Sequence, residues 1–156
     1  MRFWMRSSAL RFCCQLGLGL IFIISASGKF ANPKGFLRAV AEYRLLPEPF
    51  VALVAASLPG VELLTGLLLV MGLIGGWRVL RLYARAAALI AALMLVAFIV
   101  VLSVNLLRGI EMDCGCFDLL GDYIPFFKSK KADWGTVLRD VWMLALAIPV
   151  LLHKKG

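Results

Sequence analysis

The chain has 156 residues, of which 62% are hydrophobic and only 17% are charged. Soluble domains average about 45–50% apolar and about 25% charged residues, so this composition excludes a soluble globule and a disordered chain. The formal net charge is +8. The basic residues form no stripe with interleaved aromatic residues, so no nucleic-acid binding is predicted. The sequence has a single histidine and lacks a Gly-rich phosphate loop, which excludes the usual metal-hydrolase and nucleotide-binding motifs.

Four apolar segments are predicted to cross a membrane as helices, because about 20 residues cover about 30 Å of hydrocarbon. The first covers about residues 11–28 and begins with Cys13 and Cys14, which we interpret as small apolar packing residues. The basic start of the chain and the small residues from Ser25 to Ser27 also fit a cleavable signal sequence. The alternation of charge along the whole chain favours a retained span over a cleaved one.

The stretch from Lys29 to Glu48 is expected to lie outside the membrane. Apolar residues recur there at helical spacing from Phe36 onward, between Pro33 and Pro47. This pattern predicts a short amphipathic helix at the membrane interface.

The second span, about residues 50–74, contains one charged residue, Glu62, close to its middle. A carboxylate in hydrocarbon is costly, so Glu62 is expected to be protonated, hydrogen-bonded within the bundle, or part of a proton path. The structural interpretation is a neutral acid bonded to a neighbouring helix through Thr65. The functional interpretation is a contact that passes protons or touches a quinone headgroup.

The third span, about residues 84–107, leads into a polar segment that carries Cys114 and Cys116, separated by one glycine. In an oxidising compartment two thiols this close are expected to pair. A ring closed over one residue is strained and therefore easily reduced, and it removes little chain entropy, so it is a poor structural staple. These arguments favour a redox-active pair.

Two alternatives to the redox-active pair stay open, namely an inert structural disulfide and a pair of metal ligands supplemented by Asp113 or Asp118. No histidine or second cysteine pair lies nearby, so no metal site is predicted. The two aspartates flank the cysteines and could accept a thiol proton, or they could be solvated loop acids.

The fourth span, about residues 135–152, must include the adjacent Arg139 and Asp140 to reach across a membrane. We expect this pair to lie near the interface, where the opposite charges neutralise each other and the arginine can extend toward water.

Charge placement predicts the orientation of the spans. Three very short segments hold basic residues without any acid, and the rest of the chain holds all 9 acidic residues. By the positive-inside rule both termini face the cytoplasm and the Cys-Gly-Cys segment lies outside. The predicted fold is an all-α integral membrane four-helix bundle that forms a single domain over residues 1–156. The basic residues of the acid-free segments are Arg2, Arg6, Arg11, Arg78, Arg81, Arg85, Lys154 and Lys155.

Four sequence patterns, taken in order, resemble the methylamine-utilisation MauE family and, more distantly, DoxX-like membrane proteins. The resemblance implies a four-helix protein of the bacterial inner membrane, associated with disulfide chemistry. It also implies a role in the maturation of periplasmic proteins such as the disulfide-rich small subunit of methylamine dehydrogenase, with a thioredoxin-like periplasmic partner. The patterns are Ser27-Gly28-Lys29, Tyr43-Arg44-Leu45-Leu46-Pro47, Leu58-Pro59-Gly60-Val61-Glu62-Leu63 followed by Gly66, and Asp113-Cys114-Gly115-Cys116-Phe117.

The predicted function is therefore a membrane-embedded thiol-disulfide redox or maturation factor. Cys114 and Cys116 would exchange a disulfide with an extracytoplasmic thioredoxin-like partner or disulfide-containing client, and quinone is the candidate cofactor. A thiol-disulfide oxidoreductase and a passive carrier would share the same dithiol, so both stay open. The rival hypothesis is a non-enzymatic assembly or metal-handling factor that uses the Cys-Gly-Cys loop as a ligand or docking site.

Overall fold

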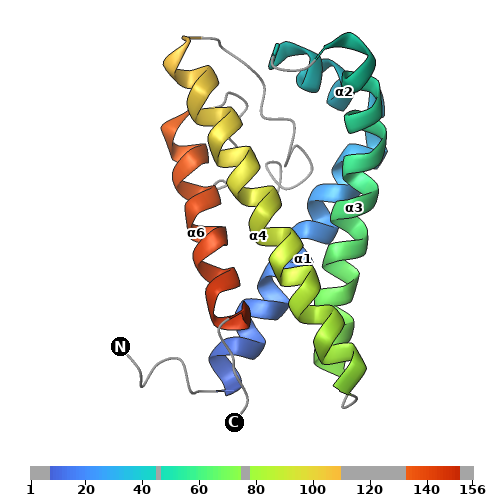
Figure 1. Ribbon diagram of the computed structural model, residues 1–156, viewed down its shortest axis with the longest axis vertical. Coiled ribbons are helices and arrows are strands. Elements are labelled where there is room, and N and C mark those ends of the chain that lie inside the picture. The colour runs from blue at the N-terminus through green and yellow to red at the C-terminus, as the bar shows by residue number, and fades with distance from the viewer. Residues whose placement is uncertain (1–7, 45–46, 75–77, 110–132, 152–156) are drawn as a thin grey trace.

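The computed structural model describes residues 8–44, 47–74, 78–109 and 133–151. These residues form an all-helical bundle without a strand, as the sequence predicted (Figure 1). The helices, in chain order, are α1 (Ser8–Ala31), α2 (Pro33–Glu42), α3 (Glu48–Ile74), α4 (Arg78–Leu107) and α6 (Trp134–Leu151).

The helices α1, α3, α4 and α6 are each long and apolar enough to cross a membrane, which confirms the predicted spans. Most of these helices extend a few residues beyond the predicted limits, because hydropathy marks only the apolar middle of a helix whose backbone hydrogen bonds continue into polar residues. The extension matters most in α1, which continues past the predicted end at residue 28 and carries Lys29 with it.

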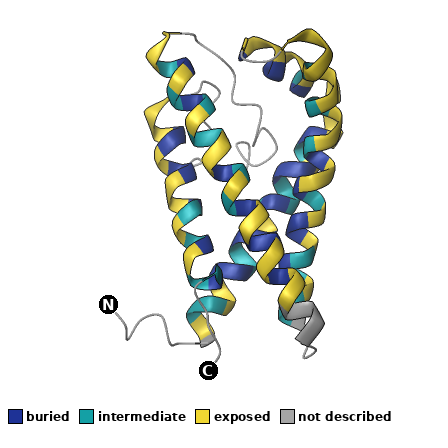
Figure 2. Cartoon of the chain, viewed as in Figure 1, coloured by how far each residue is buried: buried dark blue, intermediate teal, exposed yellow. Residues whose placement is uncertain are grey.

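The long helices form a closed ring in the order α1, α3, α4, α6, with α6 returning to α1. The start of α1 and the end of α6 lie at one end of the bundle, and α2 lies at the opposite end (Figure 1). Which end faces the cytoplasm stays a prediction from the charge pattern. The buried residues face the interior of the ring and the exposed residues face outward (Figure 2).

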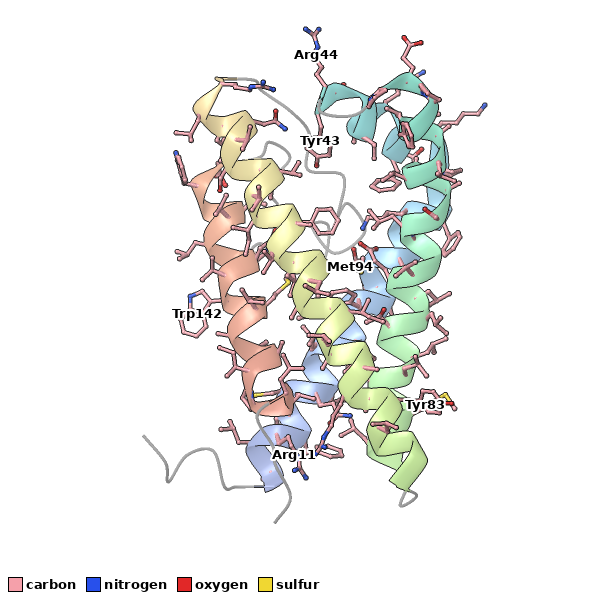
Figure 3. The ribbon with its side chains drawn as sticks, viewed as in Figure 1. Arg11, Tyr43, Arg44, Tyr83, Met94 and Trp142 are labelled. Carbon is pink, nitrogen blue, oxygen red and sulfur yellow. The ribbon has the colours of Figure 1, made fainter. Side chains whose placement is uncertain are left out.

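Large apolar side chains cover much of the outer surface, including Leu53, Leu93 and Trp142. Trp142 points away from the bundle (Figure 3). Such a surface is stable in hydrocarbon and not in water, as expected for an integral membrane protein.

The short helix α2 was predicted, and it packs mainly against α3. Asn32 caps its start, accepting a hydrogen bond from the backbone nitrogen of Gly35 at 3.0 Å, and Pro33 follows as the first helical residue. The helix ends at Glu42, before the predicted limit at Pro47. The reason is a left-handed residue, Arg44, with φ of 48°.

Because the backbone is left-handed at Arg44, the side chains of Tyr43 and Arg44 point in different directions. Tyr43 points toward the interior of the bundle, and Arg44 points away from it (Figure 3). The turn that ends α2 therefore places the buried Tyr43 over the interior of the ring.

Helices α1 and α3 approach most closely at Gly19 and Gly66. A Cβ atom added to Gly66 would lie 2.8 Å from the carbonyl oxygen of Gly19, and one added to Gly19 would lie 2.9 Å from Cγ2 of Val70. Real Cβ atoms do not make such short contacts, so the crossing depends on both glycines. By contrast, a Cβ atom on Gly17 would meet nothing within 4 Å.

The crossing predicts a difference between two glycine substitutions. We expect Gly66→Ala to push α1 and α3 apart and to lower the free energy of unfolding by about 1–3 kcal/mol. Gly17→Ala is the matched control and is expected to be neutral or stabilising by about 0.5–1 kcal/mol. Thermal unfolding of both variants in detergent, followed by tryptophan fluorescence, measures the difference, and equal behaviour of the two variants would contradict the close crossing.

Candidate functional site: a buried charged cluster

The structure describes one of the residues that the sequence singled out for function. Glu62 lies in α3 and is 2% exposed. Cys114, Cys116, Asp113 and Asp118 lie outside the described residues, so the structure provides no geometry for the Cys-Gly-Cys motif.

Glu62 forms a buried ion pair with Lys29 of α1, whose Nζ atom donates a hydrogen bond to Oε1 of Glu62. Ser25, one turn earlier in α1, completes a triangle. Its hydroxyl accepts from Lys29 Nζ at 3.2 Å and donates to Oε2 of Glu62 at 3.4 Å. Both carboxylate oxygens of Glu62 are thus engaged by α1.

Of the possibilities that the sequence left open for Glu62, the structure shows hydrogen bonding within the bundle, and two expectations about this region were wrong. The partner of Glu62 is Lys29 and not Thr65, and Lys29 lies inside the bundle and not in a segment outside the membrane. Asn32 and Pro33 mark the end of α1 and the start of α2, and this signal was readable in the sequence. It could have identified Lys29, four residues after Ser25, as an inward-facing residue of the same helix.

Two aromatic rings enclose the ammonium group of Lys29. The Nζ atom lies 5.1 Å from the ring centroid of Phe36 in α2 and 5.5 Å from that of Phe98 in α4. These distances are typical of cation–π contacts, which partly replace the lost hydration of the ammonium group. Lys29 consequently connects α1 to α2, α3 and α4 through a side chain that is fully buried.

Helix α6 contributes a second ion pair, Arg139 with Asp140. Nη2 of Arg139 lies 3.5 Å from Oδ1 of Asp140, and the two side chains are 7% and 9% exposed. The predicted neutralisation of one by the other is confirmed. The predicted extension of the arginine toward the interface was wrong, because α6 turns this face into the bundle and both side chains are buried there.

The two ion pairs line one cavity of about 30 Å³ in the interior of the bundle. Ser25, Lys29, Glu62, Arg139 and Asp140 are hereafter called the charged cluster. Its two cations and two carboxylates balance formally. Tyr43, which points inward from the end of α2, also lines this cavity.

A larger, apolar pocket of about 240 Å³ adjoins the charged cluster. Side chains of α2, α3 and α4 line it, and Tyr43 and Phe98 belong to the walls of both cavities. Phe36, which contacts the Lys29 ammonium group with its ring, also lines the apolar pocket. A cavity with charged lining and a pocket with apolar lining therefore lie side by side at this level of the bundle.

Within residues 8–44, 47–74, 78–109 and 133–151, no group of three or more His, Cys, Asp and Glu side chains could hold a metal ion. The carboxylates of the charged cluster each face a cation of the protein.

The fold and the charged cluster define an integral membrane helical bundle with a charge-balanced interior. The family model described as methylamine utilisation protein MauE matches residues 7–153, and the chain belongs to this family.

Two curated relatives carry the same name. The methylamine utilization protein MauE of Paracoccus denitrificans is 31% identical over 137 residues, which are 87% of this chain and 65% of the relative. That of Methylophilus methylotrophus is 36% identical over 103 residues, which are 65% of this chain and 50% of the relative. The matched parts therefore span one half to two thirds of the relatives. No solved structure matches the chain.

The buried ion pair predicts strongly non-additive effects of substitution. Lys29→Met or Glu62→Met alone leaves one charge buried without its partner, so each is expected to cost about 3–5 kcal/mol of stability. The double variant removes both charges and is expected to be far more stable than the sum of the single losses implies.

Thermal unfolding in detergent measures this cycle. Arg38→Met and Glu42→Met, at exposed positions of α2, provide the matched control cycle and are expected to stay within about 0.5 kcal/mol of the parent. Additive losses at Lys29 and Glu62 would contradict a direct pair.

Proposed function

We propose that this protein is a membrane-embedded thiol-disulfide maturation factor in methylamine utilisation. The observation that carries the proposal is the pair Cys114 and Cys116 in a chain of the MauE family. The names of the relatives support the pathway. The chemistry of two thiols separated by one glycine supports an exchangeable disulfide.

The proposed partner is a periplasmic thioredoxin-like protein or a disulfide-containing client. In an exchange, a thiolate of the Cys114 and Cys116 pair attacks a partner disulfide, and a mixed disulfide forms and then resolves. The pair becomes oxidised, and two electrons and two protons pass to the two sulfur atoms of the partner. The reverse reaction oxidises the partner, and the same atoms and electrons balance.

Quinone is the proposed oxidant if the protein regenerates its own disulfide. Oxidation of the dithiol releases two electrons and two protons, which reduce a quinone to a quinol. The apolar pocket of about 240 Å³ beside the charged cluster supports this assignment, because a prenyl chain needs hydrocarbon-lined space. Glu62, across the shared walls, is the proposed contact for the quinone headgroup.

We place the protein in the bacterial inner membrane with both termini in the cytoplasm. One support is the density of basic residues in the short acid-free segments. The other is that the start of α1 and the end of α6 lie at the same end of the bundle. The segment that carries the cysteines follows the end of α4 and precedes α6. Those helix ends lie at the opposite end of the bundle from the start of α1, so this orientation brings the cysteine segment to the periplasm (Figure 1).

The redox proposal predicts that Cys114→Ser and Cys116→Ser each abolish disulfide formation in the client. Without two sulfur atoms the protein can neither hold nor transfer a disulfide, so the oxidised client is expected to fall to the level of a deletion strain. Thiol trapping of the client in cells, read as a mobility shift, measures this fraction. Cys13→Ser and Cys14→Ser, near the start of α1, are the matched controls and are expected to leave the oxidised fraction of the client unchanged.

Unchanged client oxidation in the Cys114 and Cys116 variants would contradict the redox role and favour the assembly or metal-handling hypothesis. The membrane level of each variant is compared on the same samples. Loss of the protein itself would identify a structural disulfide and would also contradict the proposal.

The orientation is tested by alkylation in intact cells with a bulky reagent that cannot cross the membrane. In a Cys13→Ser, Cys14→Ser background, we expect Cys114 and Cys116 to react from outside, and only after mild reduction. Immediate reaction would contradict a labile disulfide, and reaction only after the membrane is dissolved would contradict the proposed topology.

A further inference from the structure

We propose that the charged cluster binds water in its cavity and that the hydrated cluster is a proton-exchange site within the membrane. Asp140 is the carboxylate that takes up the proton, and Asn105 marks the connection of the site to the end of the bundle where α4 ends. This inference is independent of the cysteine chemistry proposed above, because it concerns only groups on the helices.

The cavity has the size and the lining that bound water requires. Its volume of about 30 Å³ exceeds the roughly 10–15 Å³ that one water needs by this measure, and a buried water typically has 2–4 polar partners. The lining supplies a carboxylate and a cation from each ion pair. Water between them joins the Lys29 and Glu62 pair of α1 and α3 to the Arg139 and Asp140 pair of α6.

The contacts distinguish the two carboxylates. Glu62 is bonded through both oxygens, to Lys29 and to Ser25. Asp140 contacts Arg139 through one oxygen at 3.5 Å, which is a longer and weaker contact. The less tightly held carboxylate is the better acceptor for a proton delivered through the cavity.

The groups around Asp140 determine what a proton can do there. Lys29 of α1, Glu62 of α3, Arg139 of α6 and the phenol of Tyr43 after α2 line the same cavity, and α4 contributes only apolar lining. A guanidinium group carries hydrogen-bond donors and no acceptor, so Arg139 cannot take up the exchanged proton. Protonation of Asp140 changes the cluster from balanced to a net charge of about +1, a cost that hydration of the cavity reduces.

Asn105 supplies an independent observation. Its side chain is fully buried, and neither its amide nitrogen nor its amide oxygen has a hydrogen-bond partner among the described residues. Leu95, Phe98 and Leu102 line the cavity, and Asn105 follows them at helical spacing on the same face of α4, one turn closer to its end. Buried polar groups are normally hydrogen-bonded, so a water bound to this amide would satisfy it and extend the hydrated site toward that end.

Infrared spectroscopy of the purified full-length protein in lipid nanodiscs tests the proposal. We expect a carbonyl stretching band at the higher frequency of a protonated carboxyl group shielded from bulk water, separate from the band of exposed carboxyl groups. This band should grow as the pH falls and shift promptly after dilution into D₂O. Asp140→Asn should abolish the band, and Asp140→Glu should restore it. Glu42→Gln, at an exposed position of α2, is the matched carboxyl control and should leave the band unchanged.

Asn105→Leu tests the connection to the end of the bundle. We expect the band to persist and its shift in D₂O to slow by roughly tenfold or more, which corresponds to about 1.4 kcal/mol on the barrier. Gln15→Leu is the matched amide control, because Gln15 is also buried but donates to the carbonyl oxygen of Leu69 at 2.8 Å; it should not slow the shift.

Three results would overturn the proposal. They are a band that survives Asp140→Asn, a band that fails to return with Asp140→Glu in a folded protein, and an unchanged rate in Asn105→Leu. The same spectra on the Cys114→Ser, Cys116→Ser variant should match those of the parent. Failure of the redox proposal and failure of this one are therefore distinguishable.

Discussion

The ion pair between Lys29 and Glu62 is the interaction on which the interior of this protein depends. Each charge would be prohibitively costly alone inside an apolar bundle, and each is held there because the other lies against it. The pair also fixes geometry. It joins α1 to α3 on the C-terminal side of Gly19 in α1. The two helices are therefore held together at two points, the close backbone contact of Gly19 with Gly66 and the ion pair.

The remaining parts of the site are arranged around the ammonium group of Lys29. The rings of Phe36 and Phe98 bring α2 and α4 to it, and the cavity beside it brings Arg139 and Asp140 of α6. All helices of the described chain thus meet at one charged point inside an otherwise apolar ring. A bundle that needed only stability would be expected to fill this space with apolar side chains, since buried ion pairs contribute little net stability. Net stability therefore does not explain these buried charges, whereas the proton-exchange role proposed above would explain them.

The charged cluster and the cysteines of the proposed redox chemistry belong to different parts of the chain. The segment with Cys114 and Cys116 connects α4 to α6 in the sequence, and residues of these two helices line the cavity of the charged cluster. Disulfide chemistry moves protons together with electrons, so the two proposals are chemically compatible although each is tested separately. Membership of the MauE family accounts for the membrane fold, and the charged interior offers a physical starting point for its activity.

The sequence by itself determined the class of the protein and its secondary structure. A hydrocarbon span needs a continuous apolar stretch, so composition and run length were enough to identify α1, α3, α4 and α6, and the prolines around Phe36 were enough to predict α2. It also identified Glu62 as a residue that needs a partner. Only the tertiary structure decided which partner, because Lys29 and Glu62 are far apart in sequence and meet through the crossing of α1 and α3. The burial of Arg139 and Asp140 was decided in the same way, since hydropathy gives the depth of a residue along a helix but not the direction in which the packed helix turns its face.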